Sequence, residues 1–282
     1  MIVPPSAEKI PPRPARVLLQ DAHDTQGPGA VERLRAFAAI AVRPALVLTA
    51  LRPFTALPEK LVRDQWDAAL ASGPLDAALF GDLGNAARVS ALAEWLEDAP
   101  QLRRRVLDPE LVRPDGEARH PRGMAATLNA RLLPLMDVVV AGAGDLAGLI
   151  GREVESLAEL RDGARRLFDR GVPAVVVTGG RLDGHPIDYL FEGKDFIEFG
   201  TDRIRTAGLR GAGATFSALL VGHLGRGLSL SAALQAAKDG VTAALRCAQP
   251  EGEAWSAEVL GEAFEALGFD PAPIEPTRAE LV

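Results

Sequence analysis

Short apolar runs alternate with longer segments of helical spacing along the first two thirds of the chain. The apolar runs, each long enough for a buried strand, cover residues 16–20, 45–51, 75–80 and 173–182. Helical spacing follows over residues 58–71, 85–97 and 153–170, and a further helix is predicted to end near Ala39. This alternation predicts an α/β fold in which helices cover both faces of a mostly parallel sheet.

The last third of the chain has a different pattern. Residues 188–193 and 195–199 alternate around a turn that contains an acidic residue and a glycine, which is typical of a β-hairpin. Two helices are then predicted over residues 214–225 and 229–248. The hairpin and the two helices complete the predicted sheet and its covering layers.

Composition agrees with one sizeable domain between two short flanking segments. The 282 residues are 48% apolar, which is enough to bury a large core. We expect an N-terminal arm over residues 1–15, one α/β domain over 16–248, and a C-terminal helix with a proline-rich tail over 249–282.

Charge and run length exclude several classes of partner. The net charge of −7 argues against a general nucleic-acid binder, which needs a basic face. The chain has no continuous apolar stretch of about 18 residues, so no membrane span is expected. The first fifteen residues lack the apolar core of a signal peptide, and the single cysteine, Cys247, excludes internal disulfides. We therefore expect a cytoplasmic protein with neither a nucleic-acid nor a membrane partner.

A glycine-rich turn precedes the helix predicted over 214–225. Gly208, Gly211 and Gly213 lie within six residues, and an apolar run follows them. Such a turn lets backbone N–H groups face an anion, and the helix dipole adds to their attraction. The alternative interpretation is a tight connection between two elements, for which glycine is equally suited.

The residues after this turn favour the anion site. Residues 211–218 read Gly-Ala-Gly-Ala-Thr-Phe-Ser-Ala, which resembles the Gly-Thr-Gly-Cys-Thr-Leu-Ser-Ala pattern of the hydroxymethylpyrimidine/phosphomethylpyrimidine kinases of thiamine biosynthesis. The resemblance extends over roughly residues 16–248. It implies the three-layer α/β/α sandwich of the ribokinase-like superfamily, ATP and Mg²⁺ as cofactors, a small-molecule vitamin precursor as substrate, and a homodimer.

Three framework segments carry the resemblance beyond the glycine turn. Residues 106–112 resemble the family's Val-Leu-Asp-Pro-Val-Met-Val, and residues 132–140 match its Leu-Leu-Pro-Leu-Ala-Asp-Val-Val-Thr. Residues 173–182 resemble its Val-Leu-Val-Lys-Gly-Gly-His-Leu.

The resemblance assigns roles to specific positions. It implies that Asp108 and Asp145 lie at the metal, although an Asp-Pro pair such as Asp108-Pro109 also turns a chain after a strand. The predicted anion hole is then Gly211, Ala212, Gly213 and Ala214. The predicted nucleotide contacts are Thr178, Gly180, Arg210 and Thr215.

Several of these positions depart from the family pattern. Ala214 replaces the family's cysteine at the point of phosphoryl transfer, and alanine has no proton acceptor. Gly142 replaces an asparagine of the metal site, Asp145 replaces a glutamate, and Thr178 replaces a lysine near the nucleotide phosphates. The loss of one general base lowers rates by about 10²- to 10⁴-fold, so we expect slow or redirected catalysis.

The predicted substrate side is also altered. The resemblance places Asp21, Asp24, Arg33, Phe54 and Gly81 near the pyrimidine, with Arg33 in place of the family's aspartate and Phe54 in place of its glutamine. Sites built on hydrogen bonds to a substrate reject analogues steeply. The usual pyrimidine is therefore not expected to be the best ligand.

Three functions remain open at this point. The first is a phosphomethylpyrimidine-kinase-like phosphotransferase that moves the γ-phosphate of ATP to a small hydroxymethyl compound. The second is a catalytically silent homologue that acts as a ligand sensor or a partner subunit. The third is a pyridoxal-kinase-like enzyme.

Overall fold

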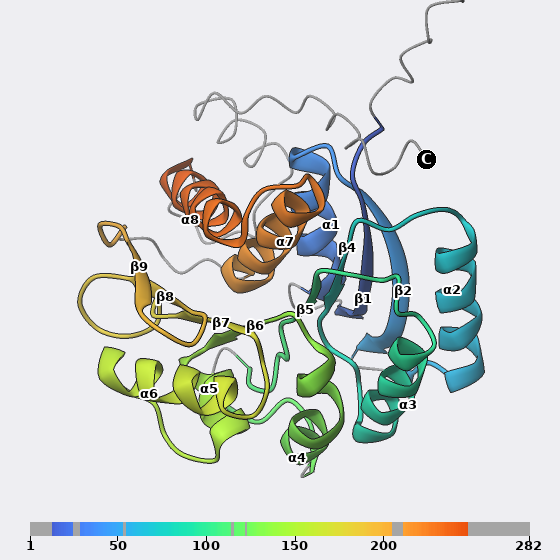
Figure 1. Ribbon diagram of the computed structural model, residues 1–282, viewed down its shortest axis with the longest axis horizontal. Helices are drawn as coiled ribbons and strands as arrows, with labels where there is room; N and C mark the ends of the chain where they lie inside the picture. The colour runs from blue at the N-terminus through green and yellow to red at the C-terminus, as the bar shows by residue number, and fades with distance from the viewer. Residues whose placement is uncertain are drawn as a thin grey trace, which may run out of the picture.

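A single nine-stranded sheet organises the chain. The computed structural model, shown in Figure 1, describes residues 13–24, 29–52, 55–113, 116–121, 123–204 and 211–247. The strands follow the order β3-β2-β1-β4-β5-β6-β7-β8-β9 across the sheet. Their bounds are β1 Arg16–Asp24, β2 Arg43–Arg52, β3 Thr55–Ala56, β4 Ala77–Phe80, β5 Arg105–Leu107, β6 Val138–Gly142, β7 Ala174–Thr178, β8 Ile187–Phe191 and β9 Phe196–Gly200.

Helices connect the strands and close the chain. The α-helices are α1 Gly29–Ala39, α2 Glu59–Ala71, α3 Ala86–Glu97, α4 Met124–Thr127, α5 Ala143–Ile150, α6 Leu157–Phe168, α7 Ala212–Gly225 and α8 Leu230–Cys247. A π-helical turn, Leu128–Leu132, and a 3₁₀ turn, Leu133–Leu135, continue α4.

The helices form two layers on opposite faces of the sheet, as Figure 1 shows. Helices α1, α7 and α8 cover one face, where Phe37 and Leu219 are fully buried. The other face carries α2, α3, α5 and α6, and its core includes Trp66 and Leu92. The three-layer sandwich predicted from the sequence is therefore confirmed.

The functional edge of the sheet follows from its strand directions. Neighbouring strands from β2 to β7 pair in parallel, whereas β3, β8 and β9 pair with their neighbours in the antiparallel sense. The parallel strands thus end together at one edge, which we call the carboxyl edge. Strand order reverses between β1 and β4, and α/β sheets bind ligands outside the carboxyl ends of strands at such a point.

The structure confirms most predicted elements, changes the bounds of others and adds two helices. The hairpin is observed as β8 and β9. The first strand, predicted over 16–20, continues to Asp24 because its pairing with β2 extends that far. The helix expected over 153–170 is α6, which begins only at Leu157 because Ser156 caps it by accepting a hydrogen bond from Glu159. Helices α4 and α5 were not predicted.

No helix in the described ranges is both long enough and apolar enough to cross a membrane.

Helix α7 lies inside the molecule and carries a buried histidine. His223 is 2% exposed, and burial lowers its pKa to about 4. Because the unfolded chain protonates this residue at a higher pH, the stability due to neutral His223 is present above pH 6.5 and lost as the pH falls toward 4.

We expect His223→Gln to remove this dependence. Between pH 7.5 and 5, the wild-type protein should lose about 2 kcal/mol more unfolding free energy than the variant. Urea unfolding at the two pH values measures the difference. Parallel losses in both proteins would contradict the assignment to His223.

Candidate functional site

The glycine turn opens α7 at the carboxyl edge. Gly211 has a φ of +91°, a left-handed conformation that favours glycine. The Thr215 backbone N–H donates to the Gly211 carbonyl at 2.8 Å, which begins the helix. The earlier N–H groups, of Ala212, Gly213 and Ala214, are first-turn donors without partners inside the helix. Gly213 is exposed, and a Cβ added there would meet no described atom within 4 Å.

Helix α7 is joined to the predicted acid by one hydrogen bond. The Ser217 hydroxyl donates to Asp108 Oδ2 at 2.7 Å, and both residues are buried. The backbone N–H of Asp108 also donates to the Phe80 carbonyl at 2.9 Å, which places Asp108 at the end of β5. The glycine turn and Asp108 therefore belong to one site.

Asp145 lies beside Asp108 from the first turn of α5. Its Oδ1 accepts hydrogen bonds from the backbone N–H groups of Leu111 at 2.6 Å and Val112 at 3.1 Å. Burial, followed by the nearby charge of Asp108, raises the pKa of Asp145 to about 6. The two predicted metal ligands are therefore close enough to repel each other.

This pair fits a magnesium ion that takes most of its ligands from phosphates and water. Asp108 Oδ1 and Asp145 Oδ2 form no hydrogen bond with any described residue, so one oxygen of each is available. Magnesium commonly uses one or two carboxylates together with substrate phosphates. The described ranges contain no larger group of acidic, histidine or cysteine side chains that could hold a metal.

The predicted nucleotide positions lie along the ends of β6 and β7. Thr178 pairs with Gly142, and a Cβ added at Gly142 would lie 3.5 Å from the Thr178 hydroxyl. Gly180 is exposed in the following turn. Thr215 is buried at 1% exposure in the first turn of α7, and its hydroxyl has no hydrogen-bond partner in the described ranges. Arg210 lies outside the described residues.

Two side chains that the sequence analysis missed hold the turn after β7. Arg203 donates to the carbonyls of Gly180 at 3.1 Å, Gly184 at 2.6 Å and Leu182. Lys238 of α8 donates to Asp188 Oδ2 at 2.8 Å.

Asp188 links α8 to the turn after β7. Its Oδ1 accepts from the Gly179 backbone N–H at 3.0 Å, so α8 is tied to the turn through Asp188. Burial raises the pKa of Asp188, and the Lys238 charge opposes this effect.

Arg33 is the centre of the predicted substrate side. Its side chain is fully buried and pairs with Asp21, with Asp108 at 2.7 Å and with Glu110 at 2.6 Å. Burial alone would lower the pKa of Arg33, but the charges of Asp21, Glu110 and Asp108 outweigh it and raise the pKa well above its usual value. Arg33 and Asp21 therefore lie beneath the surface of the site, and any role toward a substrate would be indirect.

The close packing of this pair explains Gly81. A Cβ at Gly81 would lie 2.5 Å from Arg33 Nη1 and 2.7 Å from Asp21 Oδ1. Asp21 also accepts hydrogen bonds from the backbone N–H groups of Ala22 at 2.8 Å and Asp82 at 2.9 Å. Burial raises the pKa of Asp21, and the charge of Arg33 opposes the shift. Gly81 is required because a larger residue would displace the ion pair.

A second ion pair lies next to the first, at the ends of β2 and β4. Arg52 donates twice to Asp82, at 2.6 and 2.9 Å. Burial alone would raise the pKa of Asp82, but the hydrogen bonds from Arg52 and nearby positive charges lower it. His120 Nε2 lies 3.6 Å from Asp82 Oδ1, and burial lowers the pKa of His120. Phe54, predicted to lie here, is outside the described residues.

Glu110 and Arg119 complete the site, and the sequence analysis missed both. Glu110 has a φ of +44°, and burial, together with Asp21 and Asp108, raises its pKa to about 8. Arg119 lies 3.6 Å from Asp24, another predicted substrate residue, and 3.7 Å from Glu110. The available signal was Glu110 itself, which stands at a valine of the family pattern.

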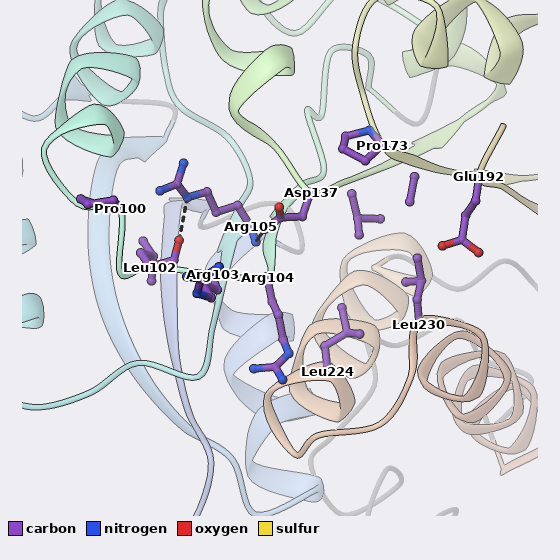
Figure 2. Close-up of a pocket in the computed structure, with 12 residues that line it drawn as sticks. Pro100, Leu102, Arg103, Arg104, Arg105, Asp137, Pro173, Glu192, Leu224 and Leu230 are labelled. Atoms are coloured by element: carbon purple, nitrogen blue, oxygen red, sulfur yellow. Dashed lines mark hydrogen bonds between the residues drawn. The ribbon is translucent and has the colours of Figure 1, made fainter. Parts of the chain in front are cut away.

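A separate groove lies at the opposite edge of the sheet, where the parallel strands begin. It has a volume of about 600 Å³, and Figure 2 shows Arg103, Arg104 and Arg105 lining it. Arg105 donates to the Leu102 carbonyl at 2.7 Å and to other main-chain carbonyls, whereas Arg103 is exposed. The groove therefore lies at the opposite ends of the strands from the candidate site.

The fold and the site together define a class. The ribokinase-like vitamin kinases have this arrangement: a three-layer α/β/α sandwich in which a glycine turn begins a late helix, beside one buried and one half-buried acidic residue. Residues 26–257 match the phosphomethylpyrimidine kinase family, and the chain belongs to that family.

Individual relatives agree with this assignment. The chain is 35% identical over 199 residues to the thiamine biosynthesis bifunctional protein ThiED of Geobacter sulfurreducens, covering 70% of this chain and 40% of that relative. It is 33% identical over 187 residues to the hydroxymethylpyrimidine/phosphomethylpyrimidine kinase of Synechococcus elongatus, covering 66% and 70% of the two chains. The pyridoxal kinase of Staphylococcus aureus in complex with AMP-PCP and pyridoxal superimposes with a TM-score of 0.74 at 26% identity, covering 83% and 88%.

Proposed function

We propose that this protein is a phosphotransferase that moves the γ-phosphate of ATP to the hydroxymethyl group of a small vitamin precursor. The observation that carries the proposal is the hydrogen bond from Ser217 to Asp108. It joins the helix that follows the glycine turn to the acidic residue at the end of β5. Membership of the phosphomethylpyrimidine kinase family supports the reaction class.

The backbone of α7 would stabilise the transferred group. In the reaction, the substrate hydroxyl oxygen forms a bond to the γ-phosphorus, the bond from that phosphorus to the β-phosphate oxygen breaks, and ADP leaves. Negative charge is spread over the phosphoryl oxygens during transfer, and backbone N–H donors and a helix N-terminus stabilise it. The first-turn N–H groups of Ala212, Gly213 and Ala214 are suited to this task.

Asp108 and Asp145 would hold the magnesium ion, each through its uncommitted oxygen. When bound, the ion neutralises phosphate charge and helps to orient the nucleotide. Lys238, Asp188 and Arg203 would keep the turn after β7 in place for the nucleotide.

The proton of the attacking hydroxyl has no acceptor at position 214. We therefore expect Ala214→Cys to raise the rate of product formation by about tenfold or more, because a thiolate can accept this proton. Ala214 is buried at 7% exposure, and cysteine adds a single atom to its side chain. Steady-state assays of ADP release measure the effect. An unchanged rate in a variant that still binds ATP would show that position 214 does not limit catalysis.

Calorimetric titration with ATP and magnesium tests the proposal first. We expect binding in the micromolar to millimolar range, followed by phosphorylation of at least one compound in a hydroxymethyl panel. ATP binding without any product would favour the silent homologue that senses a ligand or serves as a partner subunit. No binding at millimolar ATP would overturn the kinase proposal.

Pyridoxal is the second candidate substrate. The specific observation is Arg33, which stands where the family has an acid and is consumed by buried ion pairs, so that the usual pyrimidine contact is missing. The similarity to a pyridoxal kinase supports this alternative. Comparing product formation from pyridoxal and from hydroxymethylpyrimidine at equal concentration distinguishes the two.

A further inference from the structure

Buried polar atoms without hydrogen-bond partners gather at the carboxyl edge. Among the described residues they include Arg33 Nε, Arg119 Nε and His120 Nε2. Native proteins pair nearly all such atoms, and an exception commonly marks a bound water or ligand. The adjacent residues Arg119 and His120 each contribute such an atom at this edge, which indicates that a polar ligand completes the site.

Arg119 differs from the other arginines of the cluster. Its guanidinium lies 3.6 Å from Asp24, 3.8 Å from Asp82 and 3.7 Å from Glu110. These distances are too long for hydrogen bonds. Its side chain is only 10% exposed. The three carboxylates therefore balance its charge from the ends of β1, β4 and β5, but its N–H donors remain available.

Arg33 provides the comparison. Its guanidinium makes ion pairs at 2.6 and 2.7 Å and is fully buried, as expected of a structural arginine. A buried guanidinium that is neutralised but not hydrogen-bonded instead resembles a recognition group that waits for acceptors. Arg119 also lies where the strand order reverses, which is the expected ligand position in such a sheet.

The local charge restricts the ligand. Among the described residues, the cluster holds the carboxylates of Asp21, Asp24, Asp82, Asp108 and Glu110, and the arginines that pair with them are Arg33, Arg52 and Arg119. Among these described side chains the carboxylates outnumber the arginines by five to three. An anionic group would meet net repulsion here, whereas an uncharged ring nitrogen or carbonyl oxygen can accept from Arg119 without that penalty.

We propose that Arg119 is a substrate-recognition residue whose guanidinium donates to a ring nitrogen or carbonyl oxygen of an uncharged nitrogen heterocycle. The inference rests on the proposed function, because it names the part of the substrate that lies away from the transferred phosphate. Glu110, which stands at a valine of the family pattern, fixes Arg119 from the end of β5. The family pattern has no acidic residue at this position and therefore lacks the pair of Arg119 with Glu110.

The experiment measures binding rather than turnover. Calorimetry is run with hydroxymethylpyrimidine, with pyridoxal, with benzyl alcohol, which lacks a ring acceptor, and with inorganic phosphate. We expect the wild-type protein to bind at least one of the two heterocycles and to bind benzyl alcohol and phosphate at least tenfold more weakly. Arg119→Met should weaken heterocycle binding by about 10- to 100-fold, corresponding to one or two lost hydrogen bonds to a charged donor.

Two further variants separate recognition from folding. Arg113→Met, on the same loop but exposed, should leave heterocycle affinity unchanged. Arg119→Lys keeps the charge with fewer donors and should give intermediate affinity, and ATP affinity should stay within twofold in all three variants. Two results in the variants would overturn the inference: unchanged heterocycle affinity in both Arg119 variants, or equal losses of affinity for ATP and for the heterocycle. Two results in the wild type would also overturn it: binding of neither heterocycle, or tighter binding of phosphate than of the heterocycles. Arg119-dependent binding without any phosphorylation would instead sustain the inference and count against the proposed kinase activity.

Discussion

Replacing Arg33 with methionine is expected to lower the free energy of unfolding by about 3 to 5 kcal/mol at pH 7.5, since removing one partner leaves buried charge uncompensated. The substitution would leave the carboxylates of Asp21, Asp108 and Glu110 without their ion-pair partner and next to an apolar side chain. Methionine has a similar length, so the loss reports on charge more than on volume. Urea unfolding measures the change.

The pH dependence of this loss provides a second readout. Burial already raises the pKa values of Asp21 and Glu110 above their unfolded values, and without Arg33 these two pKa values should rise further. Their unfavourable effect is then present at neutral pH and fades as the pH falls toward 5, so the gap between variant and wild type should narrow. A gap that widens on acidification would contradict the assignment.

Arg166→Met is the matched control. Arg166 pairs with Asp162 at 2.8 Å, but both side chains are nearly half exposed. Exposed pairs of this kind contribute about 0.5 kcal/mol or less. A loss below about 1 kcal/mol for Arg33→Met would mean that backbone donors and Ser217 already satisfy the buried carboxylates.

Gly213→Val is expected to weaken ATP binding by at least about a hundredfold, or about 3 kcal/mol, because its branched side chain would fill the space in front of the first turn of α7. The fold should not change, since a Cβ at Gly213 meets nothing within 4 Å. Valine also has a higher helix propensity than glycine. Calorimetry with ATP and magnesium, alongside urea unfolding, measures both quantities.

Gly200→Val controls for the general effect of a branched residue. Gly200 is an exposed strand end where an added Cβ lies 3.9 Å from the nearest atom, in Ile187. Its replacement should leave ATP affinity unaltered. If Gly213→Val binds ATP as the wild type does, the glycine turn is a connection between elements and not an anion hole.

The sequence by itself determined the architecture, because the signals involved are local. A run such as Val175 to Val177 must be buried on both faces of a sheet, and it was observed there as β7. The position of Gly211 before an apolar helix was equally readable, since its positive φ is a property of one residue. Family patterns placed Asp108 and Asp145 at the same edge in the same way.

The ends of the strands and helices, and the partners of charged side chains, were harder to predict from the sequence. The first strand runs through Asp21 to Asp24 because β2 pairs with it, and the cap at Ser156 sets the start of α6. Position 33 was expected to face the substrate, but Arg33 lies in buried ion pairs. A sequence shows which residue replaces another and not what surrounds it.

Only the tertiary structure decided how the charged residues of the site are used. Arg33 pairs with acids 12 and 75 positions away, and Ser217 reaches Asp108 across 109 positions. Arg119 is held among three strand ends by charge alone. The energy of a buried charge depends on its desolvation and on partners that only folding brings within reach, so residue type alone does not distinguish a structural arginine from one available to a ligand.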